Sequence, residues 1–425
     1  MRTAALMRYA PSLSVAAALL AGCGGSQSSP PIVSSGAMMQ HSLVESALSY
    51  KILQRFVSDG IFAGLPIAGL IDVDGTLYGT TYGRASTDGT VYSMSLTGAT
   101  KMLYDFHGRN HDGSRPWAGL LDVNGTLYGT TYDGGTSDAG VVYSITTSGV
   151  EKVLYSFKGG SDGANPIAGL IDVNGTLYGT TYGGGGSAKG TIYSISTAGQ
   201  ETVLHAFTGG PGDGADPTGE LIDVNGTLYG TTPHGGVGST KCGGPSEGCG
   251  TVYTVTPKGD VKVLYRFHGG SDGRGPYAPL IESNGTLYGT TDAGGDTQCQ
   301  TIGCGTIFSI STAGKERVLY RFRGGSDGAS PRAGVIAVNG TLYGTTNAAG
   351  SSGCSDDLGC GTVYSANLSG AEKVLHVFQG GSDGENPTGT LIEVNGTLYG
   401  TTEFGGGNAP GCDDLGCGTA FALTP

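Results

Sequence analysis

One octapeptide, N-G-T-L-Y-G-T-T, returns seven times and constrains the fold more than any other feature. Its copies begin at Asp74 (a D-G variant), Asn124, Asn174, Asn225, Asn284, Asn339 and Asn395, and successive copies are 50, 50, 51, 59, 55 and 56 residues apart. Asn-Gly between two runs of β-formers favours a type I′ turn, because both central residues need a positive φ. Each copy therefore predicts a tight β-hairpin, and the spacing predicts an array of seven similar units.

Every unit carries four short strand signals separated by turn residues. In the third unit they cover residues 169–173, 176–182, 191–196 and 202–207, and no stretch shows a helical period of useful length. Four strands cannot bury both faces of their own sheet, so neighbouring units have to pack on one another. A radial arrangement of four-stranded blades achieves this and leaves only short edges.

The two ends of the repeat region indicate that the array is closed. A fourth-strand pattern appears first at residues 50–56, ahead of any octapeptide, whereas the last unit stops after its third strand at 418–424. The sequence thus predicts an all-β fold for residues 49–425: a seven-bladed β-propeller of four-stranded blades, closed by an N-terminal strand that completes the last blade. An open β-solenoid is the alternative, but it would need polar capping repeats, and none are visible.

The first 48 residues have the features of an export signal and a linker. Arg2 and Arg8 precede an apolar run over residues 13–20, which is too short to span a bilayer, and L-A-G-C follows, ending at Cys23. This stretch resembles the lipobox of bacterial lipoproteins. The resemblance implies a signal peptide at 1–22, a lipid anchor on Cys23 and a flexible tether over 23–48. It places the protein in the bacterial cell envelope, on the outer membrane or cell surface; the alternative is an ordinary signal peptide and a free thiol.

The charge balance argues against nucleic acid as a partner. Acidic residues outnumber basic ones 35 to 22, which gives a formal net charge of −13, and phosphate binding depends on the Lys and Arg that such a surface lacks. Most of the 82 glycines fall in predicted turns and loops, and they show no collagen period.

The variable loops between the second and third strands contain eight of the nine cysteines. Hairpin parity places these loops on the same face as the crossings between blades, and variable loops on a rigid scaffold are where binding usually occurs. The cysteines form four close pairs: Cys242 and Cys249, Cys299 and Cys304, Cys354 and Cys360, Cys412 and Cys417. An exported protein meets an oxidising compartment, so four local disulfides are expected. Zinc is the alternative, although each loop offers only two of the four ligands that a structural site needs.

Two recurring sets of carboxylates have both a ligand-binding and a structural interpretation. The crossings share G-G-S-D-G-x-x-P with Asp162, Asp272, Asp327 and Asp383, and Asp213 occupies the same place in another crossing; these residues suit calcium or simply an Asp-Gly turn. The innermost strands carry Asp72, Asp122, Asp172, Asp223, Glu282 and Glu393, with Ala337 interrupting the ring. They would line one end of a central channel or lie in solvent beside the hairpin turn. We expect no metal or cofactor in either place.

One crossing departs from the repeat and is the candidate ligand site. It contains His107, Arg109, His111, Asp112 and the single tryptophan, Trp117. The two histidines could hold a metal, the indole could stack on a sugar ring, or the crossing could simply have drifted. No nucleophile, base and orienting residue can be grouped from the sequence, so no catalytic residue is assigned.

The combined pattern of V-L-Y-x-F, G-G-S-D-G-x-x-P, L-I-x-x-N-G-T-L-Y-G-T-T and G-T-V-Y resembles the repeat of the choice-of-anchor tandem repeat GloVer-containing surface proteins, over residues 50–425. That resemblance implies export and repeats but supplies no activity. The sequence favours a surface-anchored binding module for a glycan, peptide or envelope protein. A carbohydrate-active lyase or hydrolase with a site near the channel mouth, and a purely structural envelope component, remain the alternatives.

Overall fold

The computed structural model describes residues 48–57, 64–84, 87–108, 111–236, 238, 242, 247–295, 299, 302–351, 354, 359–407, 412 and 415–425. These belong to one compact unit, Ser46–Pro425. The expectations for the signal peptide, Cys23 and the tether lie outside the described residues, as does Arg109. No helix in the described part of the chain is long and apolar enough to cross a membrane.

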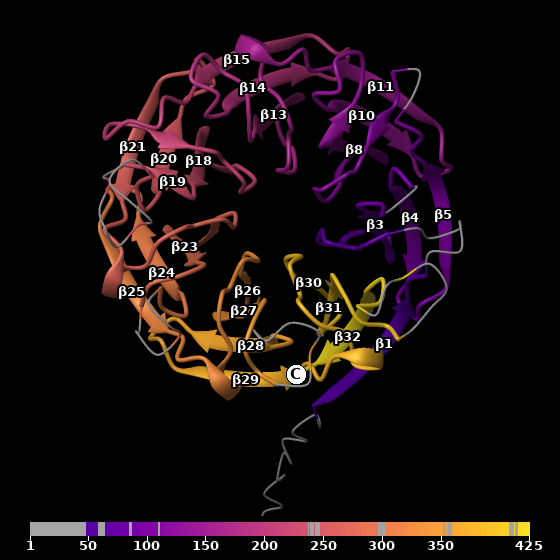
Figure 1. Ribbon diagram of the computed structural model, residues 1–425, viewed down its shortest axis with the longest axis vertical. Helices are drawn as coiled ribbons and strands as arrows, with labels where there is room; N and C mark the ends of the chain where they lie inside the picture. The colour runs from indigo at the N-terminus through magenta and orange to yellow at the C-terminus, as the bar shows by residue number, and fades with distance from the viewer. Residues whose placement is uncertain are drawn as a thin grey trace, which may run out of the picture. The chain divides into compact units, whose positions relative to one another are not determined.

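Seven four-stranded antiparallel sheets stand in a ring around a common axis, each running outward from a three-residue innermost strand (Figure 1). Blade 1 consists of β2 (Ile71–Val73), β3 (Thr76–Thr81), β4 (Thr90–Ser95) and β5 (Thr100–Asp105). Blade 2 consists of β7 (Leu121–Val123), β8 (Thr126–Thr131), β10 (Val141–Thr146) and β11 (Glu151–Ser156). Blade 3 consists of β12 (Ile171–Val173), β13 (Thr176–Thr181), β14 (Thr191–Ser196) and β15 (Glu201–Ala206).

The same order continues through the rest of the ring. Blade 4 consists of β17 (Ile222–Val224), β18 (Thr227–Thr232), β20 (Thr251–Val255) and β21 (Val261–Arg266). Blade 5 consists of β22 (Ile281–Ser283), β23 (Thr286–Thr291), β24 (Thr306–Ser311) and β25 (Glu316–Arg321). Blade 6 consists of β26 (Ile336–Val338), β27 (Thr341–Thr346), β28 (Thr362–Asn367) and β29 (Glu372–Val377). Blade 7 consists of β30 (Ile392–Val394), β31 (Thr397–Thr402), β32 (Thr419–Thr424) and, outermost, β1 (Ser49–Arg55). The predicted seven-bladed propeller is confirmed.

The octapeptide forms the predicted turn in every blade. The first residue of each copy has a φ between 50° and 55°, and the following glycine has a φ between 77° and 83°. Both values belong to the left-handed region that a type I′ turn requires. The turn joins the innermost strand to the second strand, as in β12 and β13, where Val173 pairs with Thr176.

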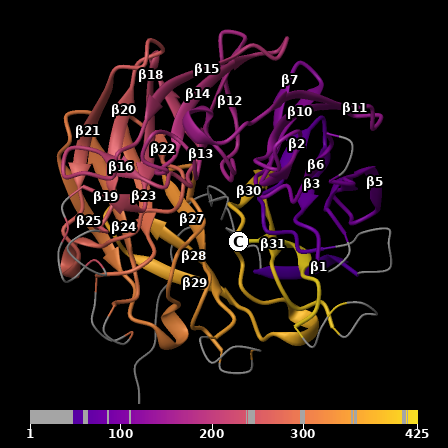
Figure 2. The ribbon, with the colours of Figure 1, turned by 45° about the horizontal axis from the view of Figure 1, so that its top comes forward.

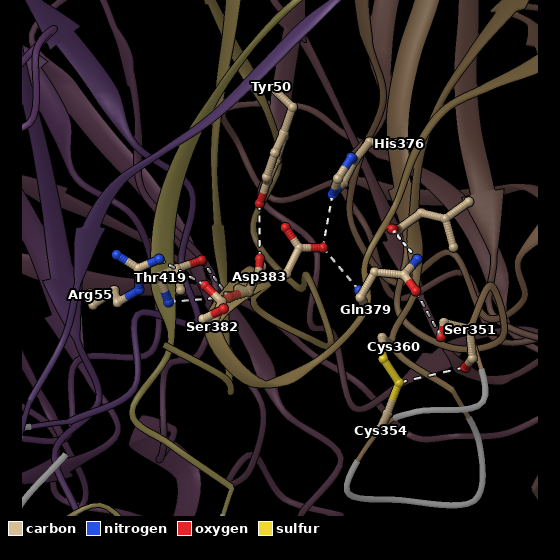
Figure 3. A network of polar contacts seen from close by, with 12 residues as sticks. Tyr50, Arg55, Ser351, Cys354, Cys360, His376, Gln379, Ser382, Asp383 and Thr419 are labelled. Carbon is tan, nitrogen blue, oxygen red and sulfur yellow. Dashed lines mark hydrogen bonds and ion pairs between the residues drawn. A yellow bond between two sulfur atoms is a disulfide. The ribbon is translucent and has the colours of Figure 1, made fainter. Parts of the chain in front are cut away.

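The N-terminal strand closes the ring as predicted. β1 pairs antiparallel with β32, from Ser49 opposite Thr424 to Arg55 opposite Thr419. Tyr50 stacks on His376 of blade 6, with ring centroids 3.6 Å apart, and its hydroxyl donates to the carbonyl oxygen of Asp383 at 2.9 Å (Figure 3). The first residues of the propeller therefore hold its last blade against blade 6.

An aromatic pair fills the space between each blade and the next. The phenylalanine that follows each fourth strand meets the edge of an aromatic ring on the third strand of the following blade, at centroid distances between 5.1 and 5.4 Å. The pairs are Phe56–Tyr92, Phe106–Tyr143, Phe157–Tyr193, Phe207–Tyr253, Phe267–Phe308, Phe322–Tyr364 and Phe378–Phe421. Because the pair across the closure matches the other six, all seven interfaces are equivalent in their packing.

The crossings and the loops after the second strands share one face, which we call the crossing face. Backbone bridges join them directly: Ala164 pairs with Gly183, Arg274 with Ala293, Ala329 with Ala348 and Glu385 with Phe404. In two blades the bridges extend to short ladders, β6 (Gly113–Ser114) with β9 (Asp133–Gly134) and β16 (Gly214–Ala215) with β19 (His234–Gly235). Figure 2 shows the blades turned, with their strands running between the two faces of the ring.

The structure joins the eight paired cysteines in four disulfides, as the sequence predicts. They are Cys242–Cys249, Cys299–Cys304, Cys354–Cys360 and Cys412–Cys417, with Cα atoms 4.9 to 5.4 Å apart. Each of these eight sulfurs is bonded to its disulfide partner, so none of them is a free thiolate that could bind zinc.

Candidate functional site

The fold separates the members of the patch in the second crossing. Asp112 has the same structural role as Asp162 in the next crossing: its carboxylate accepts from the Tyr104 hydroxyl at 3.2 Å and from the backbone N–H of His107 at 2.9 Å. His107 and His111 are exposed near the end of the outermost strand β5. Trp117 lies at the other end of the crossing, four residues before the innermost strand β7. Trp117 is therefore at the axial side of the crossing face, whereas the histidines follow the outer rim.

The recurring aspartates of the crossings hold their own loops and the neighbouring fourth strand. Asp272 accepts from the Tyr265 hydroxyl at 2.7 Å and from the backbone N–H of His268 at 2.7 Å. Among the described residues, the one group of three ligand-type side chains with donor atoms within 4.8 Å of one another is Cys354, Cys360 and Glu385, and its two cysteines form a disulfide.

The acids of the innermost strands lie at the opposite end of the axis from Trp117, beside the Asn-Gly turns. Asp122 accepts from the backbone N–H of Gly125 at 2.9 Å, and Asp223 accepts from that of Gly226 at 2.9 Å. Both aspartates are exposed. Their carboxylates therefore support the turn that follows them.

The feature of the crossing face that most strongly breaks the sevenfold repeat is a run of aromatic side chains around the axis over blades 1 to 5. We call it the aromatic arc, and it consists of Tyr82, Trp117, Tyr132, Tyr182 and Tyr277. The Trp117 ring centroid lies 5.0 Å from that of Tyr82, edge to face, and 6.1 Å from that of Tyr132. Trp117 is 42% exposed and Tyr182 is 37% exposed, which places them among the few large apolar side chains that reach solvent.

Burial raises the pKa values of Tyr182 and Tyr277, and nearby carboxylates, Asp216 for Tyr182 and Asp292 for Tyr277, raise them further. Both phenols therefore stay protonated at neutral pH and can donate a hydrogen bond. Tyr132 raises the pKa of Tyr182, and Tyr182 raises that of Tyr277, so each of these phenols lies close to the next one along the arc.

Backbone contacts of the repeat position the arc. Tyr132 donates its N–H to the carbonyl oxygen of Arg115 at 2.9 Å, two residues before Trp117. On the other side of the indole, the Thr80 hydroxyl donates to the carbonyl oxygen of Ala118 at 3.0 Å. The same threonine contact recurs in other blades, for example from Thr130 to Ala168 at 3.2 Å. The scaffold beneath the arc is thus held on both sides, and the site is pre-organised.

Ion pairs surround the arc. Arg115 donates to Asp133 at 2.8 Å and lies over the Tyr82 ring, with 5.9 Å between the guanidinium carbon and the ring centroid. Arg332 pairs with Asp292 at 3.0 Å. His234 contacts Asp216 at 3.1 Å, and Lys189 lies 3.6 Å from the same carboxylate.

One acid in this region has no such partner. Seven residues, each two positions before an innermost strand, form what we call the axial ring: Gly69, Gly119, Gly169, Glu220, Pro279, Gly334 and Thr390. The Glu220 carboxylate lies over Gly169, because a Cβ built on that glycine would be 3.0 Å from the carboxyl carbon. Burial alone raises the pKa of Glu220 to about 7. Glu220 as a whole is only partly buried, so solvent still reaches this residue.

Reasoning from the sequence identified Trp117 but missed Tyr82, Tyr132, Tyr182, Tyr277 and Glu220. Aligning the seven repeats provides the missing signal. The position after T-T holds Tyr82, Tyr132, Tyr182, Pro233, Asp292, Asn347 and Glu403, and the position after the crossing proline holds Ile67, Trp117, Ile167, Thr218, Tyr277, Arg332 and Thr388. Positions that vary within an otherwise invariant repeat mark residues that the fold does not require. The arrangement of the blades in a ring brings the position after T-T and the position after the crossing proline close to the axis.

Comparisons with known proteins identify the repeat and the fold. A family model described as a Gloeobacter/Verrucomicrobia repeat matches residues 34–243 and 237–425. No curated protein matches the chain. A europium-containing methanol dehydrogenase is 12% identical with a TM-score of 0.50, and the match covers 88% of this chain and 93% of that one. A quinohemoprotein alcohol dehydrogenase from Comamonas testosteroni is 13% identical with a TM-score of 0.49, over 88% of this chain and 76% of that one. At 12% identity, the likeness to the methanol dehydrogenase shows the fold alone.

Proposed function

This chain belongs to the Gloeobacter/Verrucomicrobia repeat family, and from that premise we propose that it is an exported binding module, anchored by a lipid on Cys23, that holds a glycan on the aromatic arc. The protein acts in the bacterial cell envelope, and its propeller serves as an interaction surface. The observation that carries the proposal is the contact of Trp117 with Tyr82 and Tyr132 at an exposed place where the repeat itself requires no aromatic residue.

Physical chemistry supports a ring-shaped ligand with hydroxyl groups. A flat, partly exposed indole stacks on the apolar face of a sugar, and the protonated phenols and charged groups around it can bond its hydroxyls. The sister positions of Trp117 hold isoleucine in blades 1 and 3, and their interfaces pack as well as that of blade 2. The indole is therefore not needed for the fold. Four disulfides in loops of the same face support an oxidising compartment.

The geometry does not favour the alternative of a glycoside hydrolase. Such enzymes use two carboxyl groups, roughly 5 to 9.5 Å apart, on either side of the scissile bond. Glu220 is the one acid of the axial ring, so that ring offers a single carboxyl group rather than a pair.

The single tryptophan of the chain makes the proposal directly testable. We expect neutral and amino oligosaccharides, screened by calorimetry with the full chain in detergent, to include ligands that also change the Trp117 fluorescence. Trp117→Ala should lower their affinity about 30-fold or more, corresponding to about 2 kcal/mol for a central aromatic contact.

Val150→Ala is the matched control, because Val150 is another large apolar residue in solvent, 67% exposed, in the turn between β10 and β11 on the opposite face. It should bind like the wild type. A ligand whose affinity is unchanged by Trp117→Ala would place binding elsewhere on the propeller, and a failure to bind any oligosaccharide would contradict the proposal.

A further inference from the structure

Glu220 is an acid that the fold itself does not require. Four of the seven positions of the axial ring hold glycine, and the other three hold Glu220, Pro279 and Thr390. The hydroxyl of Thr390 accepts a hydrogen bond from the N–H of Gly334 at 3.1 Å, so this polar member has a partner within the ring. Glu220 makes no hydrogen bond or ion pair with any described residue. The repeated blades thus serve as an internal control: glycine alone completes this part of the structure.

Leaving such a carboxylate without a partner has an energetic cost. Removing a charged group from water without a compensating contact is unfavourable, and the raised pKa of Glu220 reflects that cost. Glycine at 169 leaves the space that the carboxyl group occupies, since a side chain there would meet it. Glu220 lowers the stability of the fold at a position where four other blades have glycine, and this points to a role in binding.

The crossing that carries Glu220 contacts the aromatic arc. Thr218, two residues before Glu220, donates its hydroxyl to the carbonyl oxygen of Tyr277 at 2.7 Å. Trp117 and Thr218 occupy the same position in their respective crossings. Glu220 lies two residues after Thr218 and two residues before the innermost strand β17, so it is nearer to the innermost strands than the arc position is. A ligand stacked on the arc can direct a substituent toward the axial ring, where solvent access is retained.

We propose that Glu220 determines specificity by accepting a hydrogen bond from a protonated amine of the ligand, which makes an unacetylated amino sugar the preferred ligand class; this inference rests on the proposed glycan-binding function. Three other acids around the arc already have cationic partners: Asp133 has Arg115, Asp292 has Arg332 and Asp216 has Lys189. One carboxylate cannot provide the six to eight oxygens that calcium takes, whereas one ammonium group suits it. The net charge of −13 also attracts a cationic glycan.

Matched tetrasaccharides test the proposal with the full chain in detergent. The probes are a β-1,4-glucosamine tetramer, its fully N-acetylated form and a β-1,4-glucose tetramer, titrated by calorimetry at neutral pH. The wild type should bind the glucosamine tetramer at least about tenfold more tightly than the other two, as expected for a charge-assisted hydrogen bond.

Two variants identify the residue responsible. Glu220→Gln preserves shape and removes the charge, and Glu220→Gly restores the residue of four sister blades, so it should fold. In both variants, the affinities for the three tetramers should lie within about twofold of one another. Asp223→Asn, which changes an exposed acid in the middle of the innermost strand β17, should keep the preference. Trp117→Ala should weaken binding of all three probes.

The outcomes separate the two proposals. A wild type that binds the three tetramers equally, with affinity still dependent on Trp117, would overturn the role of Glu220 and leave the glycan-binding function standing. A preference for the amine that survives in both Glu220 variants would likewise overturn it. If none of the tetramers or other sugars binds, both proposals fail.

Discussion

Individual residues of the repeat are constrained most tightly where the second and third strands face each other. The glycine of L-Y-G-T-T lies opposite the third-strand aromatic, as Gly129 lies opposite Tyr143. A Cβ on Gly129 would be 2.5 Å from the Tyr143 hydroxyl oxygen, so only glycine leaves room for the ring to cross the strand. The aromatic ring is essential, but its hydroxyl is not: Phe308 and Phe421 occupy the position in blades 5 and 7.

Tyr143→Phe should therefore leave the free energy of unfolding unchanged or raise it by about 1 kcal/mol. The Tyr143 hydroxyl is fully buried without a hydrogen-bond partner, and burial raises its pKa, so removing it ends a desolvation cost. Urea denaturation of the two proteins measures the difference. Gly129→Ala should instead destabilise the protein by about 1 to 3 kcal/mol because it overpacks the same site. A clear loss of stability in Tyr143→Phe would show that the hydroxyl has a partner.

A single strand, β1, has the largest effect among the elements, because it converts seven units into a closed ring. It supplies Phe56 to the interface between blades 7 and 1, and Arg55 donates to the carbonyl oxygen of Ser382 at 3.2 Å (Figure 3). Arg266 and Arg321 make the same type of contact in the middle of the chain, to Pro211 at 2.8 Å and to Ser271 at 3.2 Å. β1, which comes from the start of the chain, thus makes the same type of contact as the fourth strands of blades 4 and 5.

Phe56→Ala and Phe157→Ala should then lower stability by similar amounts, about 3 to 5 kcal/mol each, as for other buried phenylalanines. Phe56 is 1% exposed and meets Tyr92 at 5.1 Å, while Phe157 is fully buried and meets Tyr193 at 5.1 Å. Chemical denaturation of both variants compares an interface across the closure with one inside the array. A much smaller loss for Phe56→Ala would mean that the ring opens between blades 7 and 1 before it unfolds.

Across the whole molecule, four interfaces between blades share one titrating arrangement at the outer rim. A tyrosine of one fourth strand contacts an aspartate of its own crossing and faces a glutamate of the next fourth strand; the Tyr265 hydroxyl lies 2.7 Å from Asp272 and 3.4 Å from Glu316. Burial, and then the neighbouring aspartate, raises the pKa to about 7 in each glutamate. They are Glu151, Glu201, Glu316 and Glu372.

These four groups predict that the propeller becomes less stable as pH rises toward 8. Their pKa is about 7 in the folded state and 4.5 ordinarily, so the folded protein holds the protons more tightly. Their contribution to stability is complete below about pH 4.5 and is lost as pH rises through about 7. Thermal melting between pH 5 and 8 should show this fall. Replacing all four by glutamine should remove most of it and leave the share of Glu220, whose pKa burial also raises to about 7, whereas Glu282→Gln, an exposed acid in blade 5, should leave the slope unchanged. An equal slope in the fourfold variant would rule these glutamates out.

Local physics made much of the fold predictable. An Asn-Gly turn, an alternating strand and a glycine opposite an aromatic each depend on neighbours within about a dozen residues, and seven copies repeat that information. The cysteine pairs are also local, five to seven residues apart, so their pairing could be predicted too. Even the closure could be inferred, because the missing fourth strand of the last unit matches the extra strand at residues 50–56.

The candidate site was not predictable in the same way. His107 and Trp117 are ten residues apart in one crossing, yet that crossing runs from the outer rim to the axis and separates them. Tyr82, Trp117 and Tyr132 come from three places along the chain and meet because adjacent blades turn about a common axis. Repetition therefore determined the seven hairpin units and their closure, since those depend on local backbone chemistry. Only the tertiary ring decided which variable positions converge in the aromatic arc, because residues about 50 positions apart become neighbours through the rotation between blades.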